Sequence, residues 1–414
     1  MHATNAMTAT DHPETAPSHQ NVAPDVLVAP DSATSWSRAK KRATLAYLLS
    51  RFLVVMGAGI AVAAQAVWSR WNGEEPVGGA SALAQVLDSW DGHWYLDVVR
   101  DGYPHHIMDN VTYFVPDARA AFFPLYPMIV RAIDWVLPGG PVSVALLLNF
   151  VLGGCVVAIV GVLARHLFDA RTAEKAMIIA AIFPGSFVLS WAYSEAVLLT
   201  IAGLCFLALT RRSWLLAGVL AALGTAARPN GLALVAACVV ASLMAIKDDR
   251  DWKSLAAPLL APVGFVGFMA FLRWHTDEDW AWFRVQREAW KESTSFGATA
   301  VERTLDFFVR PFSSPTSVLT AATVIAMIWA LALARRHRIP LMYHAYSVSI
   351  LLLMLAPATV TARPRFLFTA FPLVFPVARA LRDDEDRWWP LVVIVLAAGL
   401  VTVNGIYGVR AAIP

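Results

Sequence analysis

Long apolar runs recur along the chain from residue 43 to the C-terminus. A helix of about 20 apolar residues is long enough to cross a hydrocarbon core of roughly 30 Å. Only 15% of the 414 residues are charged, whereas charged residues make up about a quarter of a soluble domain. The runs therefore predict an all-α, polytopic integral membrane protein and exclude a soluble enzyme.

The number and direction of the membrane crossings follow from the loops between the runs. We expect about eleven transmembrane helices, over residues 43–67, 142–164, 177–191, 195–210, 214–227, 230–246, 255–273, 318–334, 341–357, 366–381 and 388–408. Basic residues are concentrated in every second short loop, as expected for cytoplasmic loops. This alternation predicts a cytoplasmic N-terminus, an external C-terminus and two long external loops, residues 68–141 and 274–317.

The run at residues 122–137 is apolar enough to be mistaken for a further span. Counting it as a span would place the basic loop at 165–175 outside, against the charge rule. We therefore expect an interfacial or re-entrant helix here, within the first external loop.

The N-terminal residues differ in composition from the rest of the chain. Residues 1–36 are rich in Ala, Thr, Ser and Pro, with few large apolar side chains, and predict a disordered cytoplasmic tail. Residues 37–414 are expected to form one transmembrane domain. The basic cluster at 38–42 precedes a run too long for a cleaved signal peptide. The Ala- and Arg-rich composition is typical of a bacterial chain, so we expect a multi-pass protein of the bacterial plasma membrane.

The first external loop carries a carboxylate among aromatic residues. Asp91 lies between Trp90 and Gly92, in the loop that follows the first apolar run. A carboxylate in partly dry surroundings can act as a general base, and Gly92 would let a sugar approach closely. The alternative is a turn acid among interfacial tryptophans. Asp97 and Asp101 are typical of an exposed helix and are the other candidate bases.

Arginines at the expected external ends of several spans are the second chemical signal. Arg228 precedes Pro229, and Arg363 and Arg365 flank Pro364. The planar guanidinium group matches phosphate oxygens, which favours a lipid headgroup or a lipid-linked phosphate as the ligand. The alternative is that each arginine only extends from a helix end toward water.

Metal and nucleotide sites are not expected. His93 and the adjacent pair at 105–106 lack the spacing of metal ligands. Two Asp-Glu-Asp runs, at 277–279 and 384–386, lie near neither a nucleotide-binding fold nor a Gly-rich phosphate loop. An activated substrate would therefore have to arrive in the membrane.

Several blocks of the sequence resemble, in order, the motifs of PIG-V-type mannosyltransferases. These blocks are Trp90-Asp91-Gly92-His93-Trp94-Tyr95 with Gly102-Tyr103, Phe122-Phe123-Pro124-Leu125-Tyr126-Pro127, Tyr193-Ser194-Glu195, Arg228-Pro229-Asn230-Gly231 and Arg363-Pro364-Arg365-Phe366. The resemblance extends over most of the chain, from about residue 45 to residue 408. It implies a GT-C glycosyltransferase with a polyprenyl-phosphate sugar donor and an external carboxylate base.

The leading interpretation is an inverting mannosyltransferase that moves mannose from polyprenyl-phosphate-mannose to a lipid or glycan acceptor on the external face. Asp91 is the expected catalytic base. The expected substrate-binding residues are Trp90, His93, Tyr95, Tyr193, Glu195, Arg228, Asn230, Arg363 and Arg365. The expected partners are membrane lipids, the lipid-linked donor and a glycolipid or glycan acceptor, without a bound cofactor, metal or nucleic acid. The alternative is a lipid or lipid-linked-oligosaccharide transporter or flippase, which would need a continuous two-sided pathway.

Overall fold

The structure, a computed structural model, describes residues 33–311, 314–359, 361–383 and 387–414. Within these residues every regular element is helical, which confirms the predicted all-α class. In chain order the elements are α1 (Ala33–Trp71), α2 (Gly79–Leu87), α3 (Asp91–Asp101), η1 (Pro116–Ala121), α4 (Leu125–Asp134), α5 (Gly140–Leu167), α6 (Ala170–Ile182), η2 (Pro184–Leu189), α7 (Glu195–Thr210), α8 (Trp214–Ala227), η3 (Pro229–Leu232), α9 (Ala233–Asp249), η4 (Trp252–Leu255), α10 (Ala256–Leu260), α11 (Val263–Thr276), α12 (Ala281–Glu288), α13 (Ala298–Val309), α14 (Pro315–Arg336), α15 (Leu341–Leu355), α16 (Pro364–Thr369), η5 (Phe371–Leu373), α17 (Val374–Asp383) and α18 (Trp389–Gly408). The tail predicted at residues 1–36 lies outside the described residues except for its last four, which belong to α1.

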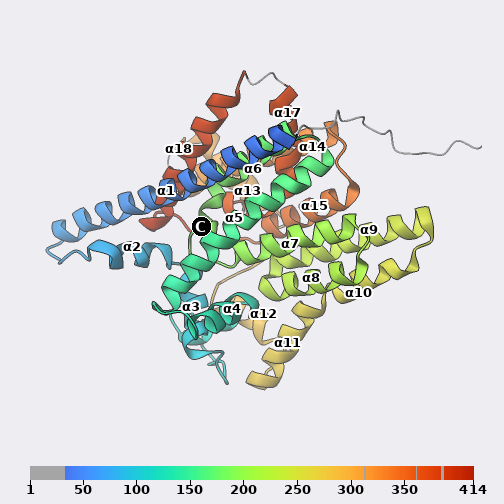
Figure 1. Cartoon of the computed structure of the whole chain (residues 1–414). Helices are drawn as coiled ribbons and strands as arrows, with labels where there is room; N and C mark the ends of the chain where they lie inside the picture. The colour runs from blue at the N-terminus through green and yellow to red at the C-terminus, as the bar shows by residue number, and fades with distance from the viewer. Residues whose placement is uncertain (1–32, 312–313, 360, 384–386) are drawn as a thin grey trace, which may run out of the picture.

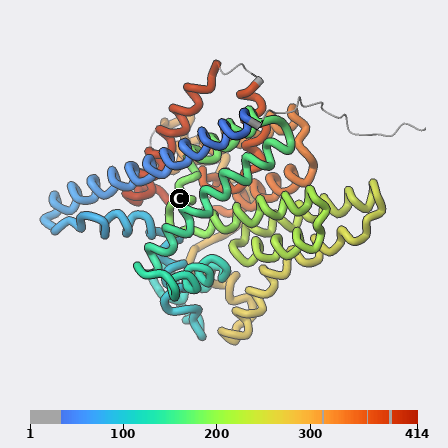
Figure 2. The backbone as a smooth tube through the Cα atoms, viewed as in Figure 1, coloured from blue at the N-terminus to red at the C-terminus, as the bar shows by residue number. Residues whose placement is uncertain are grey.

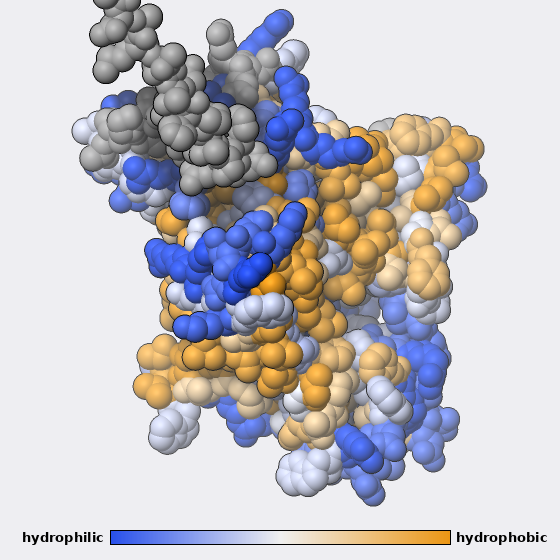
Figure 3. All heavy atoms as spheres, turned by 90° about the vertical axis from the view of Figure 1, so that its right-hand side faces the viewer, coloured by the Kyte–Doolittle hydropathy of each residue, from blue (hydrophilic) through white to orange (hydrophobic). Residues whose placement is uncertain are grey.

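Six helical segments of the described chain are long and apolar enough to cross a membrane. They are Thr34–Trp71, Gly140–Leu167, Pro229–Asp249, Trp252–Thr276, Pro315–Arg336 and Trp389–Gly408. The apolar helices α7, α8 and α15 are shorter. Large apolar side chains such as Phe52 and Ile394 are exposed, and apolar residues cover a broad part of the face in Figure 3. Exposure on this scale suits contact with lipid and is rare on soluble monomers, so the chain is a polytopic membrane protein.

Two predicted spans have the wrong bounds because proline interrupts them. The span expected at 177–191 is α6 followed by η2, since Pro184 lacks the backbone N–H that would continue the helix. The span expected at 366–381 is divided into α16, η5 and α17, with Pro372 inside η5. Backbone groups released at such breaks need partners within the protein.

The two long loops predicted to be external fold together at one end of the bundle. Helices α3, α4 and α12 gather there (Figure 1). The Trp282 indole N–H donates to the carbonyl oxygen of Ala121 over 3.0 Å, and Arg284 donates to the carbonyl oxygen of Ile107 over 3.0 Å. Helix α4 has only 10 residues, which is too short to cross a membrane and agrees with the short helix expected at 122–137. One side of the bundle therefore carries both loops.

Residues predicted to be cytoplasmic contact one another across separate helices. Arg42 of α1 forms an ion pair with Glu174 of α6 over 2.9 Å. Lys175 donates to the carbonyl oxygen of Leu381 in α17 over 3.1 Å. The contacts agree with the expectation that these segments share one side, here named the basic end. Its orientation in a cell membrane stays a prediction.

A buried arginine that the sequence analysis did not single out ties α1 to the break after α6. Arg51 donates to the carbonyl oxygens of Ala181 and Ser186 and to Ser190 Oγ, each over 2.9 Å. Carbonyl groups at a helix C-terminus lack partners within the helix and carry partial negative charge. Arg51 supplies both the donors and the opposite charge, and so stabilises the interrupted helix.

Replacing Arg51 by leucine should destabilise the fold. Hydrogen bonds to a charged group contribute about 1.5–3 kcal/mol each, and Arg51→Leu removes the charged donor from the carbonyl oxygens of Ala181 and Ser186. We expect the unfolding temperature of the purified protein in detergent to fall by several degrees. The control is Arg70→Leu at the exposed end of α1, which should change it little. Equal unfolding temperatures for both variants would contradict the role given to Arg51.

Candidate functional site

A strained turn places Asp91 at the first position of α3. Trp90 has φ 58° and ψ −121°, a backbone conformation that is uncommon for residues other than glycine. Its indole N–H donates to the carbonyl oxygen of Tyr407 over 3.0 Å, which helps to hold the turn against α18. The positive end of the α3 dipole lies at this position and attracts negative charge.

Two arginines converge on one oxygen of Asp91. Arg365 Nη1 lies 2.8 Å from Asp91 Oδ2, and Arg228 Nη2 lies 3.6 Å from the same atom. Within the described residues no hydrogen bond engages Oδ1. The arginines therefore fix the orientation of the carboxylate through Oδ2. The other oxygen, Oδ1, remains available to a ligand.

A second carboxylate completes the cluster formed by Asp91, Glu195, Arg228 and Arg365, here named the acid–arginine cluster. Glu195 Oε2 lies 2.6 Å from Arg228 Nη1, and Glu195 Oε1 lies 3.9 Å from Arg365 Nη1. The Glu195 side chain has no exposed surface, whereas that of Asp91 is 15% exposed. Asp91 is therefore the carboxylate that a substrate can reach, and Glu195 is the buried counter-ion of the arginines.

Helix interruptions place both arginines. Arg228 follows the end of α8 and has an extended backbone, with φ −165° and ψ 156°, before Pro229 begins η3. Arg365 lies in the first turn of α16, directly after Pro364. The predicted break after Ala227 is thus confirmed. Breaks of this kind bring cations into the interior of a helical bundle, where only paired charges are stable.

Two predicted aromatic residues and a serine surround the arginines. Tyr95 and Ser194 share a hydrogen bond of 2.7 Å between their hydroxyl oxygens. Arg228 Nη1 donates to Ser194 Oγ over 3.3 Å. The guanidinium carbon of Arg365 lies 5.5 Å from the centroid of the Tyr193 ring. These contacts fix the orientation of both guanidinium groups. Their N–H groups that lack a protein acceptor therefore keep a fixed direction.

Three other predicted substrate-binding residues lie outside these contacts. Arg363 donates from Nε to the carbonyl oxygen of Ile413 over 3.0 Å and from Nη1 to Thr320 Oγ1 over 2.8 Å. Figure 2 shows the C-terminal segment returning to the middle of the bundle, where the first of these bonds forms. The side chain of His93 is 60% exposed, and Asn230 lies half-buried in η3.

Gly92 does not have the role that the sequence suggested. A Cβ atom at this position would lie 3.3 Å from the Cβ of Ala192 and 3.4 Å from its carbonyl oxygen. The absent side chain therefore admits the segment before α7 and does not open space for a sugar. This correction follows from a tertiary contact that the local sequence does not reveal.

Two buried asparagines support the segment that leads to Glu195 and were missed in the sequence. Asn149 Nδ2 donates to the carbonyl oxygen of Tyr193 over 2.7 Å, and the Trp191 indole donates to Asn404 Oδ1 over 2.6 Å. Both asparagines occur within long apolar runs. A polar side chain inside a membrane span is costly unless it has a partner, and this signal could have identified them.

The acid–arginine cluster combines a proton acceptor with cationic groups that can hold an anion. Two guanidinium groups and two carboxylates balance in formal charge. Asp91 Oδ1 can accept a proton from a hydroxyl group, and the arginines can stabilise an anion that forms nearby. In the described residues no group of three or more His, Cys, Asp or Glu side chains is placed to hold a metal ion.

No family model matches the sequence, and no curated protein matches it. Among solved structures, the chain is similar to the apo oligosaccharyltransferase of Archaeoglobus fulgidus, with 14% identity and a TM-score of 0.41 over 87% of this chain and 56% of that chain. It is also similar to ArnT from Cupriavidus metallidurans bound to undecaprenyl phosphate, with 14% identity and a TM-score of 0.49 over 92% of this chain and 77% of that chain. The chain thus spans about half the length of the archaeal enzyme.

Neutralising the buried carboxylate should destabilise the protein. Removing one partner from a buried ion pair costs about 3–5 kcal/mol because the remaining charge is left uncompensated, and Glu195→Gln leaves Arg228 without its closest partner. We expect a lower unfolding temperature in detergent for Glu195→Gln. In the matched control, Asp97→Asn, the lost partners His93 and Arg100 lie 3.4 Å away and are largely exposed, so the cost should be about 0–1 kcal/mol. If Glu195→Gln unfolded at the wild-type temperature, Glu195 would not be a required counter-ion.

Proposed function

We propose that the chain is an inverting glycosyltransferase of the GT-C type, with Asp91 as its catalytic base. It transfers mannose from polyprenyl-phosphate-mannose to a lipid or glycan acceptor at the external membrane surface. The observation that carries this proposal is the single oxygen of Asp91 held by two arginines while its other oxygen accepts no hydrogen bond in the described residues. The resemblance to PIG-V-type enzymes supplies the choice of mannose and of the external face.

The proposed reaction is a single displacement. The acceptor hydroxyl oxygen forms a bond to the anomeric carbon as the bond from that carbon to the phosphate oxygen breaks. The leaving phosphate keeps the electron pair, and Asp91 Oδ1 receives the hydroxyl proton. Attack opposite to the leaving group inverts the anomeric centre, which requires base and phosphate site to hold the two reactants in line.

The arginines have a second task in this mechanism, because charge develops on the leaving phosphate. Preorganised cations aimed at a developing charge often supply the largest part of catalysis. Without substrate, Arg365 is neutralised by Asp91 over 2.8 Å. A bound phosphate competes for this arginine, so donor binding weakens the hold on Asp91 and makes it a better proton acceptor. Glu195 remains paired with Arg228 as the permanent counter-ion.

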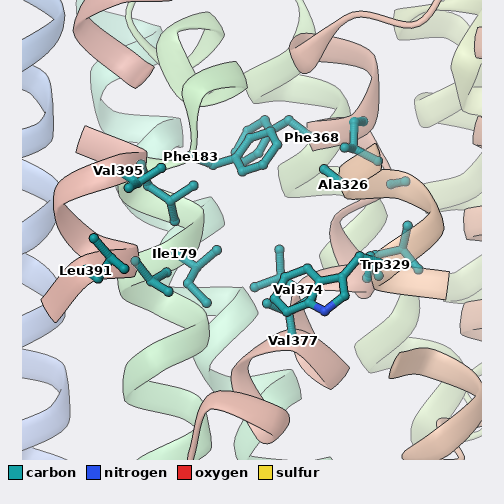
Figure 4. A pocket seen from close by; sticks show the side chains of 15 residues that line it. Ile179, Phe183, Ala326, Trp329, Phe368, Val374, Val377, Leu391 and Val395 are labelled. Atoms are coloured by element: carbon teal, nitrogen blue, oxygen red, sulfur yellow. The ribbon is translucent and has the colours of Figure 1, made fainter. Parts of the chain in front are cut away.

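An apolar hollow beside α16 offers room for the lipid chain of the donor. It has a volume of about 340 Å³ and is lined by residues of α6, α14, α16, η5, α17 and α18. Figure 4 shows the rings of Phe183 and Phe368 stacked at one side, with Trp329 across the hollow. Phe368 lies one helical turn after Arg365 on α16. This short helix therefore brings the phosphate-binding arginine and the apolar wall close together.

The substitution Asp91→Asn tests the base directly. It keeps the shape of the side chain and removes its basicity, so transfer of radiolabelled mannose from polyprenyl-phosphate-mannose into a native lipid extract should fall by about a hundredfold or more. Binding of polyprenyl phosphate should persist or strengthen, since a competitor for Arg365 is weakened.

The control for this assay is Asp97→Asn, which alters an acid of the same helix that pairs with exposed groups. It should retain most of the transfer. A folded Asp91→Asn variant with near-normal transfer would remove Asp91 from the mechanism. Absence of transfer by the wild-type protein, together with movement of the intact lipid-linked sugar across vesicles, would favour the transporter.

The substitution Arg365→Lys tests the phosphate site. Lysine keeps the charge and loses the planar fork, and a lost charged hydrogen bond of about 1.5–3 kcal/mol corresponds to roughly ten- to a hundredfold weaker binding of polyprenyl phosphate. Arg363→Lys is the matched control, because its guanidinium group contacts Ile413 and Thr320 instead of the cluster. Equal loss of phosphate binding in both variants would contradict the assignment.

A further inference from the structure

Helix α18 carries a buried carboxamide that takes no direct part in the proposed reaction. Asn404 has no exposed surface, and a polar side chain inside a membrane span is costly unless it has partners. Its Oδ1 accepts from the Trp191 indole N–H over 2.6 Å, and its Nδ2 donates to the carbonyl oxygen of Val54 in α1. An indole N–H can only donate and a carbonyl can only accept, so these partners determine which way the amide faces.

The surroundings of this amide leave it little freedom. Helices α1 and α18 lie side by side (Figure 1), and a Cβ atom on Gly57 of α1 would lie 2.8 Å from Asn404 Nδ2. Trp191 has no exposed surface, and its ring lies edge-on to Phe187, with centroids 5.2 Å apart. The hydrogen bond thus joins two side chains that are each tightly enclosed.

The Trp191 ring leads toward the acid–arginine cluster through one further ring. It lies edge-on to the Tyr193 ring, with centroids 5.7 Å apart and an interplanar angle of 78°. The guanidinium carbon of Arg365 lies 5.5 Å from the centroid of that same Tyr193 ring. Within the described residues the Tyr193 hydroxyl has no hydrogen-bond partner. The direction of the Tyr193 ring therefore depends on neighbours such as Trp191.

Arg365 relies on ring contacts because it has few polar ones. Its one hydrogen bond in the described part of the chain goes to Asp91 over 2.8 Å, and its Nε has no partner. A bound phosphate would compete with Asp91 for this guanidinium group. Once the bond to Asp91 weakens, the rings of Tyr193 and Phe366, with centroids 5.5 and 4.6 Å from the guanidinium carbon, keep the planar group directed.

The same turn of α18 also holds the segment that carries Asp91. Tyr407 follows Asn404 by three residues and therefore lies on the same side of the helix. Its carbonyl oxygen accepts from the Trp90 indole N–H over 3.0 Å, and Trp90 directly precedes Asp91 at the start of α3. One turn of α18 thus anchors both partners of the contact between Asp91 and Arg365.

We propose that Asn404 is a positioning residue for the donor phosphate. Its bond to Trp191 fixes two packed rings, and through them the plane of the Arg365 guanidinium group. This inference rests on the proposed function, since it needs a phosphate at Arg365. Asn404 touches no substrate. A merely structural amide would stabilise the fold and leave the phosphate affinity of the folded protein unchanged, so the two roles differ in a measurable quantity.

The test is binding of polyprenyl phosphate to the purified full-length protein in nanodiscs. Asn404→Leu keeps a similar volume and removes both hydrogen bonds of the amide. We expect phosphate binding by the folded variant to weaken by about three- to tenfold. The matched control is Ser242→Ala, which removes a buried hydrogen bond of 2.9 Å to Ser254, between α9 and η4. It should leave phosphate binding unchanged.

A double-mutant cycle separates positioning from general destabilisation. Arg365→Lys removes the planar group that the rings direct. Adding Asn404→Leu to Arg365→Lys should therefore weaken binding no further than Arg365→Lys alone. Independent effects would multiply, and that result would overturn the proposal, as would wild-type affinity in Asn404→Leu.

A second variant and the wild-type protein complete the test. Trp191→Phe removes the same indole donor and retains an aromatic ring, so it must reproduce both results even if Asn404→Leu fails to fold. Unchanged phosphate binding in Trp191→Phe would overturn the proposal. A wild-type protein that binds no polyprenyl phosphate would contradict the proposed function itself, and this inference with it.

Discussion

The ion pairs of Arg228 and Arg365 with Asp91 and Glu195 are the interaction on which the rest of the structure depends. An uncompensated charge inside a helical bundle costs several kcal/mol, so none of the four side chains is stable there alone. The acids begin α3 and α7, Arg228 stands at the break before η3, and Arg365 lies in the first turn of α16. Four distant segments must therefore meet at one point.

This requirement accounts for the irregular parts of the bundle. Continuous helices would bury their backbone polar groups but could not direct charged side chains from their ends into the interior. The breaks at Pro229 and Pro364 do so. At the break before Pro184, Arg51 donates to the carbonyl oxygen of Ala181. The strained backbone of Trp90 belongs to the same arrangement, since it sets the start of α3. The irregular backbone at Trp90, Pro229 and Pro364 thus lies where the chemistry is proposed.

Much of this organisation could be predicted from the sequence, and the remainder depends on distances that a sequence does not contain. The apolar runs predicted the helical class, and Pro229 indicated the interruption between α8 and α9. Asp91 and Arg365 are 274 positions apart, however, and no local pattern pairs them. Arg363 and Arg365 flank one proline and look equivalent, yet one contacts the C-terminal segment and the other contacts Asp91. Only the packing around α16 separates them.

The central claim is that a lipid phosphate binds at the arginines that hold Asp91. The most direct test is an experimental structure of the full chain in nanodiscs with polyprenyl phosphate bound. The account predicts the phosphate within hydrogen-bonding distance of Arg365 and Arg228, with Asp91 Oδ1 facing open space beside it and Glu195 still paired with Arg228. A phosphate bound elsewhere, with both arginines still fully engaged by the two carboxylates, would contradict it.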